Sequence, residues 1–185
     1  MKTAGNGPIV PALSFQYPGP PNGPKGIQAT FQLQISLKNI GHSVATADVD
    51  FDLFLANWNS TGFADAIVAE QKRFCDSFLT ENRHVPTLRA VMFPDDPYEW
   101  SGAAASMVHP ENINRSPETG ITGFIIPVVV VCVNYRSSGL SKTYQTRALY
   151  EVFRSDNRSR FFEVERGVPA NEIFMIRDLF GDYAY

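Results

Sequence analysis

The sequence predicts a mainly β protein: a two-sheet antiparallel β-sandwich of immunoglobulin-like architecture, with one inserted helix at about residues 60–79. Two long segments alternate apolar and polar residues, a third is apolar at both parities, and one carries apolar residues at helical spacing. The chain has 185 residues, of which 44% are hydrophobic and 19% charged, enough for one globular domain. The comparison with immunoglobulins concerns architecture alone, because the cysteine and tryptophan spacing of an antibody domain is absent.

The N-terminal part of the chain differs in composition from the rest. Residues 16–26 read QYPGPPNGPKG, which is typical of a long turn or linker. Before them, residues 8–15 can form a short strand at a sheet edge, where proline is tolerated. We therefore divide the chain into an N-terminal edge strand and Pro/Gly-rich linker, 1–26, and a single β-sandwich domain, 27–185.

Residues 27–38 and 44–55 alternate apolar and polar side chains with period two, which predicts two half-buried strands. A polar turn, residues 39–43, separates them. We expect these strands to form a hairpin in which Lys38 pairs with Val44 and the odd-numbered residues of both strands face the core. A slip by one residue would bury the polar face, so the register is well specified.

Three carboxylates, Asp48, Asp50 and Asp52, fall on the polar face of the second strand. Alternate side chains on a strand stand about 6.5–7 Å apart, which is too far for ligands of one calcium ion. The intervening residues are Val49 and Phe51, and no glycine follows to make the tight turn of a metal loop. We interpret the row as a solvated face and expect no metal there.

A helix is predicted next, capped by Ser60 or Thr61 and ending at about Leu79. Its apolar stripe should pack on the sheet, although a helix that binds a partner would show the same pattern. The stripe consists of Ala64, Ile67, Val68, Gln71, Phe74, Cys75 and Phe78.

The second half of the chain predicts further strands. Residues 124–133 are apolar at both parities, which indicates a central strand covered on both faces. A turn at residues 137–139 leads into an alternating strand ending at Val152. Shorter strands are expected at residues 88–93, 103–108 and 159–164. Residues 169–180 are ambiguous, and we favour a short helix or irregular structure over a strand.

Composition excludes several classes of function. The net charge is −3 and the pI about 5.6, and the basic residues are scattered, so we expect no nucleic-acid partner. No apolar run approaches the roughly 18 residues of a membrane span, and no signal-peptide core is present. The two cysteines, Cys75 and Cys132, lie in apolar settings, and we favour two unbonded thiols over a disulfide between them.

The common catalytic, metal and phosphate-binding motifs are missing, including GxSxG, HExxH, Walker A, GxGxxG and CxxC, so we expect no catalytic residues and no cofactor. The best remaining cluster is FPDDPYEW, where aromatic residues beside carboxylates suit recognition. The candidate binding loop consists of Asp95, Asp96, Tyr98, Glu99 and Trp100. The alternative interpretation is a turn with an aromatic side chain tucked onto the sandwich edge.

Two stretches resemble signatures of a bacterial protein family. LKNIGHSVATADVDFDLF resembles an NxGxxPA strand–turn–strand motif, with Val44 in place of proline. PVVVVCVNYRSSGLSKTYQTRALYEV is similar to a GCVDY strand followed by an HQT strand, with Val131 and Asn134 replacing glycine and aspartate. QKRFCDSF resembles a helical cysteine segment of the same proteins, which are uncharacterised β-domains that follow membrane-spanning helices. The resemblance implies an extramembrane β-sandwich domain and supplies no catalytic residues.

We therefore expect a non-enzymatic binding or scaffolding module with a protein partner, the soluble part of a bacterial membrane-associated protein of unknown function. Membrane association would require a segment outside this chain. One alternative is an enzyme whose site assembles from loops carrying His84, His109, Asp95 and Asp96. Another is a structural protein of a phage or virion, which would form an ordered oligomer.

Overall fold

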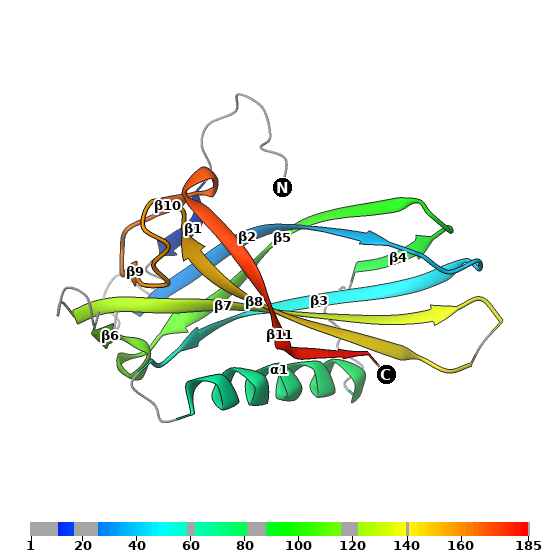
Figure 1. Ribbon diagram of the computed structural model, residues 1–185, viewed down its shortest axis with the longest axis horizontal. Coiled ribbons are helices and arrows are strands. Elements are labelled where there is room, and N and C mark those ends of the chain that lie inside the picture. Colours follow the sequence, from blue (N-terminus) through cyan, green and yellow to red (C-terminus); the bar gives the residue numbers. More distant parts are fainter. Residues whose placement is uncertain are drawn as a thin grey trace.

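The computed structural model is a β-sandwich of two antiparallel sheets with a helix on one outer face (Figure 1). It describes residues 11–16, 26–58, 62–80, 88–115, 122–139 and 141–184. The smaller sheet has the order β10 (Val168–Pro169), β1 (Pro11–Gln16), β2 (Ile27–Lys38), β5 (Pro97–Val108). The larger has the order β11 (Ile173–Ala184), β8 (Tyr144–Arg154), β7 (Thr122–Ser137), β3 (Ala45–Ala56), β4 (Leu88–Met92). Two short strands, β6 (Asn114–Arg115) and β9 (Phe162–Glu163), also pair with β7, and 3-10 turns lie at Pro110–Asn112 and Ala170–Glu172.

The main core lies between the two sheets. Phe31 and Leu33 of the smaller sheet meet Leu53 and Leu55 of the larger, and Phe162 is fully buried beside them. Burying one such side chain contributes roughly 1.5–3 kcal/mol. The fold class predicted from the sequence is confirmed as a mainly β, two-sheet antiparallel sandwich with one inserted helix.

Strand β7 is central and covered on both faces, as its apolar sequence predicts. Ile125, Val129 and Val131 face the core between the sheets. Val128 and Val130 face the opposite side and join the clusters beneath the helix. Since neither face of β7 meets water over residues 125–132, the side chains there need not alternate between apolar and polar.

The predicted hairpin between residues 27–38 and 44–55 is wrong, although the inward direction of the odd-numbered residues is right. β2 pairs with β1 and β5, whereas β3 pairs with β7 and β4 in the other sheet. Both strands face the same core from opposite sides, so alternation gives the same inward face in either arrangement. The turn at residues 39–43 crosses between the sheets, and β2 instead matches β5 over twelve consecutive positions.

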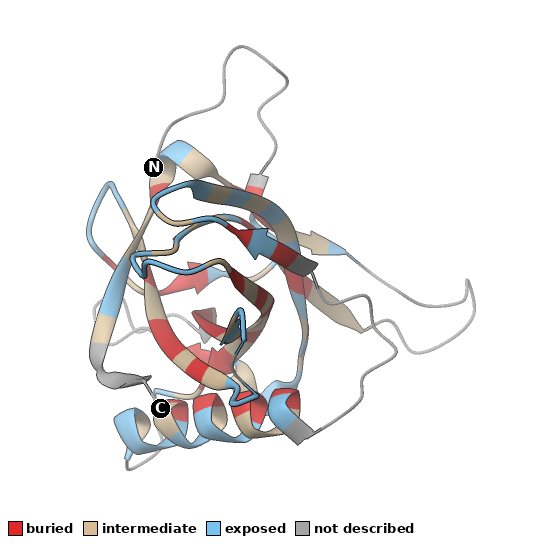
Figure 2. Ribbon diagram, turned by 90° about the vertical axis from the view of Figure 1, so that its right-hand side faces the viewer, coloured by how far each residue is buried: buried red, intermediate tan, exposed pale blue. Residues whose placement is uncertain are grey.

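The helix α1 (Phe63–Thr80) confirms the predicted segment and packs on the outer face of the larger sheet (Figures 1 and 2). Ile67, Phe74 and Phe78 are buried against the strands, whereas Ala64 at the start of the predicted stripe is exposed. The predicted cap at residues 60–61 lies outside the described residues.

Three other elements differ from the prediction. β1 lies between β10 and β2 and is therefore internal, because the two-residue β10 takes the edge position. β5 begins at Pro97, six residues before the strand predicted there. Most of the segment 169–180 is strand rather than helix, because residues from Ile173 onward pair with β8 and so extend the sheet.

Candidate functional site

The candidate binding loop divides between a turn and a strand. Asp95 and Asp96 lie in the turn before β5, where both are exposed. Tyr98 and Trp100 belong to β5 and point toward the sandwich interior, and Trp100 makes an edge-to-face contact with Phe51, with centroids 4.7 Å apart. The two aromatic residues are thus packing residues, in agreement with the alternative interpretation, and the acidic residues alone face solvent.

Two turns meet beside these acids and form what we call the distal tip, residues 39–43 and 93–96, at the right-hand end of Figure 1. Asn39 joins the turns through its side chain, whose Nδ2 donates to the carbonyl oxygens of Ser43, at 2.8 Å, and Met92, at 3.2 Å. Its Oδ1 accepts from the Gly41 amide, and its backbone oxygen accepts from the Asp95 amide, at 2.9 Å. The asparagine singled out by the sequence resemblance therefore holds the tip together.

The distal tip exposes two large apolar side chains. Ile40 is 86% exposed and Phe93 is 56% exposed, whereas the neighbouring Met92 is buried. The parallel bridge between Asn39 and Pro94 places Ile40 and Phe93 in adjoining turns. Sequence reasoning missed both, because an isolated isoleucine or phenylalanine in a turn does not indicate which way it points.

The charge around these side chains is mainly acidic. Asp95 forms an ion pair with Lys38, at 3.1 Å, and Glu99 accepts a hydrogen bond from Gln34, at 3.1 Å. Asp96 is exposed beside them. Cations flank the tip on the β7–β8 hairpin, where Arg136 donates to Thr143 and Lys142 lies over the Tyr144 ring.

The residues of the predicted catalytic cluster are not brought together where the structure describes them. His109 follows the last residue of β5, whereas Asp95 and Asp96 precede its first residue. Twelve residues at about 3.3 Å each separate them by roughly 40 Å. His84 lies outside the described residues, so the enzyme interpretation stays a prediction without a formed site.

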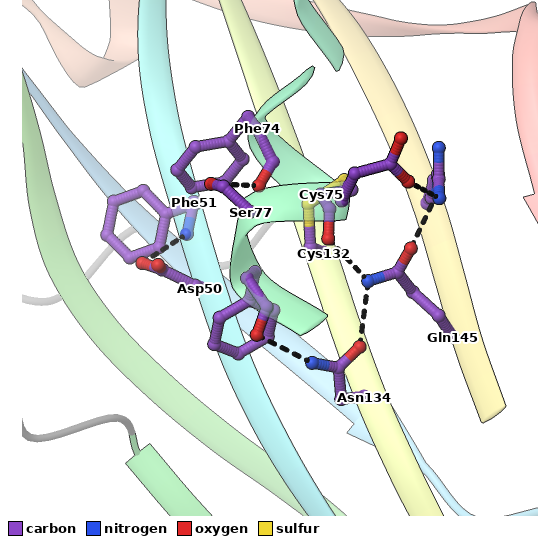
Figure 3. Close-up of a disulfide and its surroundings, with 11 residues drawn as sticks. Asp50, Phe51, Phe74, Cys75, Ser77, Cys132, Asn134 and Gln145 are labelled. Carbon is purple, nitrogen blue, oxygen red and sulfur yellow. Dashed lines mark hydrogen bonds and ion pairs between the residues drawn. A yellow bond between two sulfur atoms is a disulfide. The ribbon is translucent and has the colours of Figure 1, made fainter. Parts of the chain in front are cut away.

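A second cluster, which sequence reasoning missed, fastens α1 to the larger sheet. Cys75 of α1 and Cys132 of β7 form a fully buried disulfide, with Cα atoms 5.6 Å apart (Figure 3). The expectation of two unbonded thiols is therefore wrong. The cysteines are 57 positions apart in the sequence, and their apolar settings predict burial, but only the docking of α1 brings them within bonding distance.

A chain of polar side chains surrounds the disulfide (Figure 3). The Gln145 Nε2 donates to the Cys75 carbonyl oxygen, at 2.9 Å, and to Asn134 Oδ1, at 2.8 Å. Arg147 donates to Gln145 Oε1, at 2.7 Å, and forms an ion pair with Asp76 of α1. These contacts satisfy buried polar groups that would otherwise destabilise the fold. The polar face of β8 is thus a helix-docking face.

The Asp76 carboxylate joins this network to the surface. Lys72, one helical turn earlier, approaches it to 2.6 Å, and Arg147 approaches from the sheet. The hydrogen bond from Lys72, followed by that from Arg147, lowers the pKa of Asp76 from its ordinary value. The carboxylate therefore stays ionised and links α1 to β8.

The row of Asp48, Asp50 and Asp52 is half-buried on the face of β3 that α1 packs against. The interpretation as a solvated face holds only in part, because the helix covers part of this face. Burial raises the pKa of Asp52 above its ordinary value, and Glu70 of α1 adds to the rise. The Asp52 Oδ1 accepts from the Leu53 amide, at 2.8 Å. Among the described residues, no group of three or more His, Cys, Asp or Glu side chains is arranged to hold a metal ion.

A third cluster encloses the guanidinium of Arg160. It lies over the rings of Trp58, Phe153 and Phe63, at 5.0, 5.3 and 5.9 Å from their centroids. Glu151 pairs with it at 2.8 Å, and burial raises the pKa of this carboxyl. The three aromatic rings therefore bind an arginine of the same chain, and the contact fixes the segment after β8 against the start of α1.

The chain matches no family model, no curated protein and no solved structure. The resemblance to membrane-anchored β-domains therefore stays a prediction, and the candidate site depends on geometry alone. In the part of the chain that the structure describes, no helix combines the length and apolar character needed to cross a membrane.

Proposed function

We propose that this chain is a non-enzymatic binding or scaffolding module whose protein partner docks on the distal tip. The observation that carries the proposal is the exposure of Ile40 and Phe93 beside Asp95, Asp96 and Glu99. Large apolar side chains rimmed by polar groups are typical of protein-binding surfaces. Asn39 holds the two turns together, so less conformational entropy is lost on binding than at a free loop.

The charge of the tip indicates the chemistry of the partner. Of the cations near the three acidic side chains, Lys38 already pairs with Asp95, and Arg136 and Lys142 on the flanking β7–β8 hairpin already contact Thr143 and Tyr144. A complementary surface would present apolar groups for Ile40 and Phe93 together with basic side chains for Asp96 and Glu99. Such complementarity raises the association rate and excludes acidic competitors.

We further propose that the domain works on the oxidising side of a bacterial membrane, as the soluble part of a membrane-associated protein. Buried disulfides persist in the periplasm and on cell surfaces and are rare in the reducing cytosol. The Cys75–Cys132 disulfide supports this placement. The resemblance of two sequence stretches to motifs of membrane-anchored β-domains supports it independently.

The test is a comparative capture from solubilised bacterial membranes with three purified, immobilised chains. These are the unaltered chain, the tip variant Ile40→Ser/Phe93→Ser, and the control Ile176→Ser. Ile176 is a matched control because it is 51% exposed on β11, away from the tip. Quantitative mass spectrometry should find proteins that the unaltered chain and the control retain and the tip variant loses.

Two results would contradict the proposal. One is an identical set of captured proteins for all three chains, since that would place binding elsewhere. The other is turnover by the purified chain in a broad screen of hydrolase and transferase substrates. Thermal unfolding of each variant confirms that the comparison is made between folded proteins.

A further inference from the structure

Strand β5 leaves one side of its backbone open. It pairs with β2 over twelve consecutive positions without a register shift. No described strand pairs with its other side. The alternate N–H and C=O groups on that side therefore form a ready template for another strand.

The middle of β5 lacks the features by which proteins block such edges. Residues 101–108 read SGAAASMV, with no charge and no proline. The described positive-φ residues lie elsewhere in the chain, so the strand has no glycine kink or bulge of that kind. The other edges are protected differently: β10 has two residues, β4 has five, and β11 carries Arg177 and Asp178.

The sequence around Ala104 is nearly symmetric, S-G-A-A-A-S. A two-fold axis at Ala104 would pair two copies of this strand antiparallel. Each residue would then lie opposite the residue of the second copy that is equally far from Ala104 on the other side. Ala103 then lies opposite Ala105 of the second copy, and Glu99 lies opposite His109. All four side chains are exposed; Ala103, Ala105 and Glu99 lie on the outer face of the sheet, and His109 directly follows the strand.

We propose that β5 pairs with β5 of a second copy of this chain, joining two four-stranded sheets into one continuous sheet about a two-fold axis at Ala104. The small outward residues let the strands approach without steric conflict. The uncharged centre brings no like charges together, and two Glu99–His109 contacts place an acid opposite an imidazole at either end. This self-pairing involves Glu99, but it leaves Ile40, Phe93 and Asp96 of both copies available to a partner.

The test measures the oligomeric state of the disulfide-bonded chain by sedimentation velocity and light scattering, up to about 1 mM, where even a millimolar Kd is detectable. The unaltered chain should dimerise. Ala103→Lys/Ala105→Lys places lysine opposite lysine twice and should weaken dimerisation at least tenfold. Ala103→Glu/Ala105→Lys places opposite charges face to face and should restore it.

The matched control is Thr30→Lys/Gln32→Lys, which adds the same charge at the two β2 positions that pair with Ala105 and Ala103, one strand inside the edge, and should leave the dimer intact. A monomer at every concentration overturns the proposal. So does a dimer unaffected by Ala103→Lys/Ala105→Lys, or one that the Glu/Lys combination fails to restore. Thermal unfolding shows whether each variant is folded. An edge that binds only a foreign extended peptide would appear as a monomeric chain and would also overturn it.

Discussion

Strands β2 and β3 have nearly the same alternating pattern, yet their polar faces meet different surroundings. The polar face of β2, with Gln32, Gln34 and Lys38, is exposed on the outside of the smaller sheet. The polar face of β3 lies on the side where α1 packs, so Asp52 loses part of its hydration. The difference shows that alternation identifies which residues leave the core, but not what covers them afterwards.

The contrast is sharper for glutamine. Gln34 on β2 is exposed and donates to Glu99, whereas Gln145 on β8 is buried and joins Asn134 to the Cys75 carbonyl oxygen. A polar residue on an outer sheet face can therefore be a surface group or part of a helix-docking network. The presence of α1 decides between these roles.

The largest expected effect comes from removing the bond that holds the helix on the sheet. Cys75→Ala/Cys132→Ala should lower the free energy of unfolding by about 2–5 kcal/mol, since a native disulfide constrains the unfolded chain. Urea denaturation measures this. Reductant should bring the unaltered chain to the same stability and leave the variant unchanged; a reductant-insensitive unaltered chain would contradict the account.

The next effect compares the two glutamines directly. Gln145→Ala leaves buried partners unsatisfied in Asn134 and Arg147 and should cost about 1–3 kcal/mol. Gln34→Ala removes an exposed hydrogen bond and should change stability by less than about 0.5 kcal/mol. Urea denaturation of both variants under identical conditions provides the comparison. Equal losses would show that α1 does not cover the face of β8.

Neighbouring positions of β5 should show that the smaller sheet is packed on its inner side only. A Cβ atom added at Gly102 would overlap the ring of Trp100, so Gly102→Ala should destabilise the fold by about 1–3 kcal/mol. Ala103→Ser, on the outer face, should be nearly neutral. Repeating Gly102→Ala in a Trp100→Ala background should abolish most of its cost, and an undiminished cost would rule out the clash with Trp100.

The smallest effect concerns the partly covered acids. Burial raises the pKa of Asp52 above its ordinary value of 3.8, so its contribution to stability is fully present below that value and is lost as pH rises through the raised folded pKa. Asp52→Asn introduces an amide that does not ionise, so the variant does not lose this stability as the pH rises. Its side-chain oxygen can still accept from the Leu53 amide. The variant should be more stable than the unaltered chain at pH 7, with the advantage disappearing near pH 3. Thermal unfolding at both pH values measures it.

The control for this pH effect is Asp96→Asn, in the exposed turn, which should leave stability unchanged at both pH values. An Asp52→Asn variant that is less stable at pH 7 would mean that the carboxylate makes a favourable ionic contact, and the interpretation of its burial would be wrong.

Sequence patterns predicted which residues enter the core, but not which strands become neighbours. The odd residues of β2 and β3, the two-sided burial of β7 and the helix α1 all follow from local periodicity. Strand pairing depends instead on competition between strands that are far apart in the sequence. In this fold, β5 pairs with all twelve residues of β2. For the same reason residues from Ile173 onward became strand, since the edge of β8 supplied hydrogen bonds that no local signal indicated.

The candidate site was predicted only in part. The acids Asp95, Asp96 and Glu99 are exposed, whereas Tyr98 and Trp100 turn inward because β5 starts earlier than its sequence indicates. Ile40 and Phe93 belong to one exposed surface only because two turns meet. Asn39 joins these turns across more than fifty residues of chain. Sequence spacing carries no information about such a contact.

The central claim is that α1 is locked across the larger sheet by a bond between Cys75 and Cys132. The most direct test unfolds the purified chain without reductant, exposes it to iodoacetamide and measures its intact mass. We expect no alkylation before reduction and two added groups after it, with a linked pair of peptides in the unreduced digest. Alkylation of both cysteines in the unreduced chain would contradict the claim.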